Sequence, residues 1–424
     1  MIKTDYSHSV ILEPSKCVGC TYCIRNCPTE AIRLINGKAS IIAKKCIDCG
    51  ECIRTCPNHA KSAVTDSLDI IKNFKYSVAL ALPVLYGQFK NYNSPAMILS
   101  ALKSIGFDDA YDTSIGSEIT GSILKTIVKG YNVKPVISST CPAILRLIQV
   151  RFPELIGNIL DIETPVEISA RVIKNAIAKK TGLDISDIGI ILITPCTARV
   201  TSIRKPIGID FSYIDGAISI KDIFGSMLKA LPNVKISNDE VYGLTRRNML
   251  CTTSGGQVIH FENENTMAVD GIHNAISILE KIEMDQLDEM DFIEIAACPK
   301  GCLGGPLVVE NKFIALNKIN RIARNLPENF ETEYDTEKCL EMYKEGFIRL
   351  TNKIKPMEVT KLDPDLNISI KKMDAIRNLV SSLPGIDCGI CGSPTCQSFA
   401  EDVITGARPN AVCPVMNILP SIKK

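Results

Sequence analysis

The chain is poor in several residue types and sequence features, and each shortage argues against a class of function or a cellular location. Tryptophan is absent and there are only four histidines, so acid–base chemistry based on histidine is not expected to dominate. Lys and Arg total 48 against 47 Asp and Glu, a formal net charge of +1, and this balance argues against nucleic-acid and membrane partners. The apolar runs are far shorter than the roughly 20 residues that span a bilayer. The first residues lack the basic start and apolar run of a secretory signal, so we expect a cytoplasmic protein.

Cysteine, in contrast, is abundant, with 18 of the 424 residues. Secreted domains rich in disulfides are short and dominated by loops, and this chain is neither. We therefore expect metal ligands in a reducing compartment. The cysteines form one group between residues 17 and 56, a second between 388 and 413, and six scattered positions between them.

The first group is an internal repeat of Cys-x2-Cys-x2-Cys-x3-Cys-Pro. This is the spacing with which bacterial-type ferredoxins hold two 4Fe–4S clusters, the fourth cysteine of each run serving the other cluster. Zinc is the alternative, but its sites do not require this crossed pattern. The expected ligands are Cys17, Cys20, Cys23, Cys27, Cys46, Cys49, Cys52 and Cys56.

The long middle section alternates apolar runs with segments of helical period, which predicts an α/β fold with parallel sheets. Strands are expected at 78–85, 135–138, 188–193 and 292–296, and helices at 118–129, 166–180, 223–231 and 272–287. Cys141, Cys196 and Cys298 each follow a predicted strand. Ligand sites in such sheets form where strands end, so these three cysteines are expected to converge on one crevice.

Residues 325–368 are polar, with a helical pattern at 336–353, and the chain after them carries a compact set of four cysteines. These are Cys388, Cys391, Cys396 and Cys413, which predict a further 4Fe–4S site with zinc as the alternative. The expected organisation is a small α+β ferredoxin-like domain at 1–74, a two-lobed central domain at 75–324, a helical closing segment and linker at 325–368, and a small helical iron–sulfur module at 369–424.

Three stretches of the middle section resemble the catalytic domain of FeFe hydrogenases. They are Ser-Ser-Thr-Cys-Pro at 138–142, Thr-Pro-Cys-Thr-Ala-Arg at 194–199, and Glu-Ile-Ala-Ala-Cys-Pro-Lys-Gly-Cys-Leu-Gly-Gly at 294–305. In the family, the corresponding three stretches are, in the same order, Thr-Ser-Cys-Cys-Pro, Met-Pro-Cys-Thr-Ala-Lys and Glu-Val-Met-Ala-Cys-Pro-Gly-Gly-Cys-Ile-Gly-Gly-Gly. The tail resembles a small 4Fe–4S module of redox-complex subunits and of hydrogenase branches assigned to sensing.

The resemblance implies a set of four ligands for the cubane of an H-cluster. These are Cys141, Cys196, Cys298 and Cys302, with Cys302 also bridging to a two-iron unit where dihydrogen is split or formed. Independently of the family, four thiolates suit a soft iron–sulfur cluster, and the glycines after Cys298 let the backbone approach a bulky group. Ordinary buried cysteines are the alternative.

The chain departs from the family at positions around the two-iron unit. Thr140 replaces the cysteine that relays protons, and Arg199 replaces the lysine that anchors a cyanide ligand. Thr194 and Ala296 replace two methionines. Ser202 lies near the place of an expected acidic residue, and Glu118 is the nearest candidate for a relay carboxylate. A threonine hydroxyl passes protons less readily than a thiol, so slow turnover is expected.

Two further features are interpreted as structural. Ser254-Gly255-Gly256-Gln257 resembles a family segment near the pocket but alone is a generic turn, and Cys251 and Cys339 have no partner at ligand spacing. No nucleotide-binding glycine motif is found.

The leading hypothesis is therefore an iron–sulfur oxidoreductase of low turnover that senses dihydrogen. Dihydrogen and protons are its expected substrates, and a ferredoxin or a signalling protein its redox partner. The alternatives are an electron-transfer protein that holds only 4Fe–4S clusters, and a non-enzymatic protein whose interactions are controlled by redox state.

Overall fold

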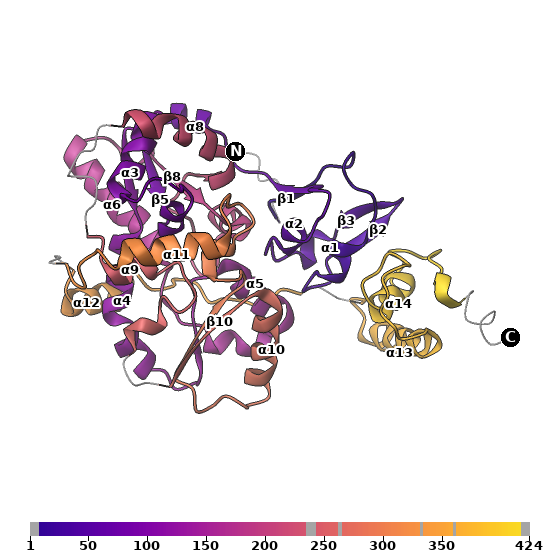
Figure 1. Ribbon diagram of the computed structural model, residues 1–424. Coiled ribbons are helices and arrows are strands. Elements are labelled where there is room, and N and C mark those ends of the chain that lie inside the picture. Colours follow the sequence, from indigo (N-terminus) through magenta and orange to yellow (C-terminus); the bar gives the residue numbers. More distant parts are fainter. Residues whose placement is uncertain (1–7, 235–242, 262–264, 331–333, 359–361, 417–424) are drawn as a thin grey trace.

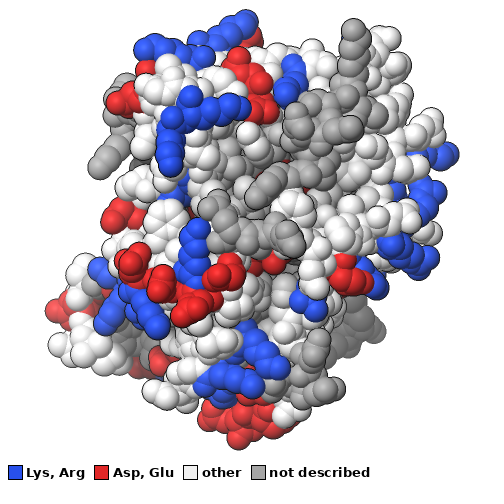
Figure 2. Space-filling model, turned by 90° about the vertical axis from the view of Figure 1, so that its left-hand side faces the viewer, with Lys and Arg blue, Asp and Glu red and all other residues white. Residues whose placement is uncertain are grey.

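The computed structural model describes residues 8–234, 243–261, 265–330, 334–358 and 362–416. It consists of a large central part, a smaller N-terminal part beside it, and a C-terminal pair of helices that lies next to the N-terminal part (Figure 1). Within these residues, no helix combines the length and the apolar character that a membrane crossing requires. On the end of the central part seen in Figure 2, basic and acidic side chains are interspersed.

The first sheet of the central part consists of four parallel strands in the order β6-β5-β8-β9. All seven residues of β8 are buried, because helices cover both faces of the sheet. The strands are β5 (Tyr76–Ala81), β6 (Asp109–Asp112), β8 (Ile188–Thr194) and β9 (Gly216–Ser219). The helices around it are α3 (Pro95–Ser104), α6 (Pro165–Thr181), α8 (Ile220–Ala230) and α11 (Lys312–Ala323).

The second sheet has three parallel strands in the order β10-β11-β7. They are β7 (Val136–Ile137), β10 (Thr266–Asp270) and β11 (Phe292–Ala296). Its helices are α4 (Ser114–Lys129), α5 (Pro142–Arg151), α10 (Ile272–Glu283) and α12 (Thr336–Lys344). Each sheet is embedded in apolar clusters of its own, so the predicted two-lobed α/β architecture with parallel sheets is confirmed.

Several predicted element bounds are wrong for identifiable reasons. The strand expected at 78–85 ends at Ala81, because Pro83 begins a buried 3-10 turn that is as apolar as the strand. The strand expected at 135–138 is only two residues long. The helix expected to reach residue 353 ends at Lys344, just before Gly346 at φ +81°. The helix expected to reach residue 287 ends at Glu283, before Asp285 at φ 53°.

The N-terminal part consists of two short antiparallel strand pairs and two single-turn helices. β1 (Val10–Leu12) pairs with β4 (Lys61–Ala63), and β2 (Ile32–Ile35) pairs with β3 (Lys38–Ile41). The helices are α1 (Tyr22–Arg25) and α2 (Glu51–Arg54). The apolar core of this part consists of a few aliphatic residues with cysteines packed among them. Without bound clusters, so small a core would stabilise the fold weakly.

The buried Asp48 fastens the N-terminal part to the central part. Its carboxylate accepts hydrogen bonds from the backbone N–H groups of Ser9 and Val10, at 2.9 and 3.3 Å, and from the Thr201 hydroxyl. Its carbonyl accepts from the Thr197 hydroxyl. The cysteine loop that contains Asp48 therefore lies directly against the helix that follows Cys196.

The C-terminal part consists of α13 (Leu366–Ser382) and α14 (Cys396–Ile404). It docks on the N-terminal part through Arg33, whose guanidinium binds Asp402 at two nitrogens, one of them at 3.1 Å. The side chains of Arg33 and Asp402 are only 3% and 8% exposed. Leu34 N–H also donates to the carbonyl of Gly392 at 2.8 Å. The division of the chain at residues 74, 324 and 368 stays a prediction, and α13 begins just before the last of these boundaries.

Replacing Arg33 is expected to loosen the C-terminal part. In Arg33→Met, Asp402 would stay buried without its main cationic partner, which costs about 3–5 kcal/mol. Urea unfolding followed by amide exchange in α14 measures this loss. Lys45→Met is the matched control, because Lys45 contacts Glu401 at 3.7 Å in a more exposed pair that contributes about 0–1 kcal/mol. Equal, small losses in the two variants would contradict the expectation.

Candidate functional site

The four cysteines that the family resemblance selected line one cavity, here called the central cavity. Cys141 follows β7, Cys196 follows β8 and Cys298 follows β11, so the carboxyl ends of strands from both sheets meet there. Cys302 lies in the 3-10 turn Gly301–Gly304. The cavity measures about 70 Å³, several times the space that one water requires. The convergence expected from the sequence therefore occurs, while the ligand roles of these residues stay a prediction.

Local geometry explains why these sulfurs can gather. Cys141 is the N-cap of α5, and Cys196 is the N-cap of α7 (Thr197–Arg204), so the positive ends of two helix dipoles lie beside them. Gly301 adopts φ +70°, and a side chain there would come within 2.6 Å of the Thr252 carbonyl. Cys302 N–H donates to that same carbonyl at 2.8 Å. Glycine is required at position 301 because the turn presses directly on the neighbouring loop.

Burial dominates the electrostatics of three of the four thiols. Burial, together with the charges of Cys298 and Cys141, raises the pKa of Cys196 to about 12. Burial likewise raises the pKa of Cys298 and Cys302. Thiols in such surroundings become thiolates only when a cationic partner compensates them. The donor set therefore fits a soft iron–sulfur cluster.

Arg199 and Thr140 lie on the wall of the central cavity. Arg199 is 7% exposed, and its Nη2 donates to the Thr140 carbonyl at 3.1 Å. The Thr140 hydroxyl lies 2.9 Å from the Ser138 hydroxyl, which in turn donates to Gln257 Oε1. The Thr140 hydroxyl thus belongs to a short chain of hydrogen-bonded side chains that ends at the Gln257 amide oxygen.

Glu294 fixes the loop that carries Gln257. Its buried carboxylate accepts from the N–H groups of Gly255, Gln257 and Val258 at 3.1, 2.8 and 3.2 Å. Burial raises the pKa of Glu294 to about 7, although these hydrogen bonds oppose the shift. The Ser-Gly-Gly-Gln segment, interpreted from sequence as a generic turn, therefore orients the side chain that bonds to Ser138.

The sequence interpretation missed three polar residues of the cavity wall. Cys251 lines the cavity and accepts from the Ser117 hydroxyl at 3.2 Å. Thr113 and Thr252 line the same cavity, and their hydroxyls are buried and have no hydrogen-bond partner. The family-like Ser-Gly-Gly segment that follows Cys251 was the available signal. Cys339, in contrast, is fully buried in an apolar cluster.

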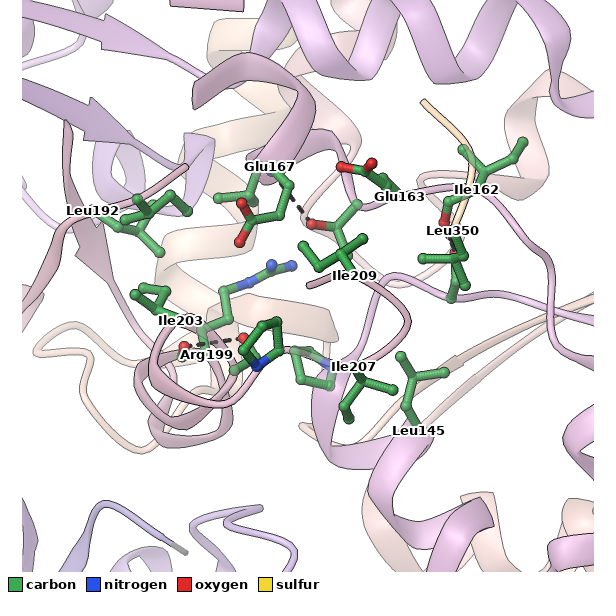
Figure 3. Close-up of a pocket in the computed structure, with 17 residues that line it drawn as sticks. Leu145, Ile162, Glu163, Glu167, Leu192, Arg199, Ile203, Ile207, Ile209 and Leu350 are labelled. Carbon is green, nitrogen blue, oxygen red and sulfur yellow. Dashed lines mark hydrogen bonds between the residues drawn. The ribbon is translucent and has the colours of Figure 1, made fainter. Parts of the chain in front are cut away.

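Glu118, the loosely placed candidate for a relay carboxylate, does not line the described wall of the central cavity, and neither does Ser202, which lies near the place of the expected acidic residue. Glu118 accepts from Asn248 Nδ2 at 3.0 Å. Ser202 donates to the carbonyl of Arg199 at 3.0 Å and lines an adjoining pocket of about 40 Å³. That pocket is mostly apolar, and the Arg199 guanidinium lies below Glu167 in it (Figure 3). Arg199 thus separates the two cavities and lines both.

The eight N-terminal cysteines group as the crossed ferredoxin pattern requires. One hollow, here called the first ferredoxin site, is lined by Cys17, Cys20, Cys23 and Cys56. Cys27, Cys46, Cys49 and Cys52 lie close enough to raise one another's pKa, although burial is the larger cause. We call these four residues the second ferredoxin site. The backbone N–H groups of Ala31 and Ala60 donate to the sulfurs of Cys27 and Cys56, both at 3.2 Å.

A third hollow in the C-terminal part is lined by the last four cysteines, Cys388, Cys391, Cys396 and Cys413. Burial raises the pKa of Cys391. In the part of the chain that the structure describes, no three donor side chains approach closely enough to hold a single metal ion. A cubane does not require such an approach, because each of its thiolates binds a different iron.

Comparison with known proteins agrees with this arrangement. The profile described as "Iron only hydrogenase large subunit, C-terminal domain" matches residues 74–260 and 247–306, which is more than half of the chain. A "4Fe-4S dicluster domain" profile matches residues 9–57, and an Fe-S cluster profile matches residues 383–415.

Curated relatives are similar over part of their length. Iron hydrogenase 1 of Clostridium pasteurianum is 26% identical over 48% of this chain and 41% of its own. The periplasmic Fe hydrogenase large subunit of Nitratidesulfovibrio vulgaris is 28% identical over 46% of this chain and 51% of its own. The chain thus spans about half the length of these two relatives. A probable cytosolic Fe-S cluster assembly factor, oxy-4 of Caenorhabditis elegans, is 22% identical over 62% of this chain and 71% of its own.

Solved structures share the fold at low sequence identity. A structure from a study of oxygen inactivation of an FeFe-hydrogenase superposes with a TM-score of 0.51 at 16% identity, covering 66% of this chain and 94% of that one. A variant of HydA1 from Chlamydomonas reinhardtii gives 0.50 at 16% identity, covering 67% and 94%. The predicted fold and family are confirmed, and this chain belongs to the iron-only hydrogenase family through the C-terminal domain of the large subunit.

Proposed function

We propose that the chain is a slow, hydrogen-sensing hydrogenase that holds an H-cluster in the central cavity. The observation that carries this proposal is the set of polar residues that line the cavity together with the four cysteines. Arg199 is one of them, and Thr113 and Thr252 are two more whose buried hydroxyls have no hydrogen-bond partner. Buried donors without acceptors are costly. A two-iron unit with cyanide and carbonyl ligands would supply those acceptors, together with the chemistry of dihydrogen.

Each residue of the wall has a distinct part in this proposal. Cys141, Cys196, Cys298 and Cys302 would hold the cubane, and Cys302 would also hold the two-iron unit. Arg199 would orient a cyanide ligand by hydrogen bonding. Thr140 would pass protons through its hydroxyl contact with Ser138, whose own hydroxyl is oriented by the Gln257 amide oxygen. A hydroxyl holds its proton more firmly than a thiol, so proton delivery limits turnover.

Electrons would leave the central cavity through the N-terminal part. The Arg54 guanidinium donates to the sulfur of Cys298 at 3.4 Å, and its charge also acts on Cys49 of the second ferredoxin site. The first ferredoxin site would follow, and then the C-terminal site, where Arg25 and Leu34 lie against Gly389 and Gly392. We propose that a redox partner, a ferredoxin or a signalling protein, exchanges electrons at this end.

An electron-transfer protein without the two-iron unit is the second candidate. Ala296 on the cavity wall, and Thr194 beside it, are the positions where the family resemblance expects methionines. Less side-chain volume encloses the space beside the cubane as a result. We also propose a cytoplasmic location, which agrees with the 18 free cysteines.

Infrared spectroscopy tests the main proposal directly. Protein matured with the two-iron unit should show bands of carbon monoxide and cyanide ligands, and these bands should shift under hydrogen. Arg199→Met should weaken or shift the cyanide bands, because it removes their cationic donor. Matured protein that shows no such bands would overturn the proposal and favour the second candidate.

Iron content distinguishes the two candidates without any activity. Four cubanes give about 16 irons per chain, and an added two-iron unit gives about 18. We expect about 18 after maturation and about 16 after reconstitution with iron and sulfide alone. A Cys302→Ala variant is the control, since it should fail to gain the last two irons.

Restoring a thiol at position 140 should accelerate turnover. Thr140→Cys is expected to raise the rate of hydrogen evolution by up to about 10²–10⁴-fold, the usual contribution of a positioned proton donor. Thr140→Ser retains a hydroxyl and should leave the rate nearly unchanged. Infrared bands of equal intensity would show that the variants are equally loaded. Equal rates in all three proteins would contradict a limit set by proton delivery at this position.

A further inference from the structure

Lys61 is a buried lysine that the protein leaves without a partner. It is the first residue of β4, where it pairs with Leu12 of β1, and it is 4% exposed. Its Nζ is fully buried and makes no hydrogen bond. An ammonium group in such a position is strongly disfavoured unless negative charge lies nearby.

The hollow that Lys61 lines is also lined by cysteine sulfurs, which would carry negative charge as cluster ligands. Lys61 lines the first ferredoxin site together with Cys17, Cys20, Cys23 and Cys56. Its charge lowers the pKa of Cys23 in that site and also the pKa of Cys52 in the second ferredoxin site, although burial raises both overall. Lys61 therefore lines the first site, and β4, which it begins, packs against α2, the helix that contains Cys52 of the second site.

The other charged groups near these sites are already satisfied. Asp48, which acts on Cys52, is held by Ser9, Val10 and Thr201. Arg54 is paired with Glu51 and contacts Cys298. Lys38 donates to the carbonyl of Cys17 at 2.6 Å. Lys61 is thus distinguished from these neighbours by its buried ammonium group without a protein acceptor.

We propose that Lys61 raises the reduction potentials of both ferredoxin-type clusters. A cluster with four thiolate ligands is negatively charged and gains one further negative charge on reduction. A fixed cation in a dry environment stabilises the reduced form more than the oxidised form. The N-terminal part therefore accepts electrons more readily than an otherwise identical part with a neutral residue at this position.

The test is a potentiometric titration of the reconstituted full-length chain, followed by electron paramagnetic resonance. In Lys61→Met, the ratio of reduced to oxidised ferredoxin-type clusters at fixed potential should fall at least about tenfold, a shift of about 59 mV for a one-electron couple. Lys61→Arg keeps the charge and should stay close to the unmodified protein. Clusters of the C-terminal part should be unaffected and serve as an internal reference.

Controls separate this charge effect from damage to the fold. Lys44→Met removes an exposed charge from the same part of the chain, and solvent screening should leave the potentials unchanged. If Lys61→Met does not retain its clusters, Lys61→Gln supplies a neutral side chain of polar character for the same measurement. Unchanged potentials in the neutral variant that retains its clusters would overturn the proposal. The titration needs neither the two-iron unit nor dihydrogen, so its outcome is independent of the proposed function.

Discussion

Desolvated sulfur is the constraint on which the rest of this structure depends. The cysteines of the central cavity and of the second ferredoxin site lie where burial raises the pKa of most of them and neighbouring thiols raise it further. Such thiols are stable in a fold as neutral groups, and they become metal-binding thiolates only where a cation compensates the charge. The small core of the N-terminal part, in which cysteines pack among a few aliphatic residues, depends on this compensation most directly.

The free-energy cost of burying a charge without a partner also governs the junctions between the parts of the chain. The Arg33–Asp402 pair is a buried ion pair that spans the boundary between two parts. Asp48 is a buried charge that accepts hydrogen bonds from Ser9 and Val10 within the N-terminal part and from Thr201 across the boundary. A charge of this kind tolerates only one docking geometry, because any other leaves it desolvated and unpaired. Fixed junctions keep the cysteine sites at constant separations, which a route for electrons requires.

Groups that remain unsatisfied are as informative as those that are paired. Most buried polar atoms in proteins have a partner, so Thr113, Thr252 and Lys61 require an explanation. All three lie on walls where cysteines also gather. An anionic inorganic group would satisfy the hydroxyls in the central cavity and the ammonium in the N-terminal part. The same interpretation thus accounts for two separate sites.

From the sequence alone, the cysteine spacing predicted the crossed grouping of the eight N-terminal cysteines, and the alternation of apolar runs with helical segments predicted the α/β class. The positions of Cys141, Cys196 and Cys298 after predicted strands predicted that these three residues converge. These are local or periodic properties, since short motifs constrain their own geometry and parallel strands end at a common edge. Other features depended on which segments pack together. They are the position of Cys251 on the cavity wall, the unpartnered hydroxyls of Thr113 and Thr252, and the burial of Lys61. Residues distant in the chain create those environments, so no local pattern encodes them. Only the tertiary structure decided which polar groups were enclosed and which of them found partners.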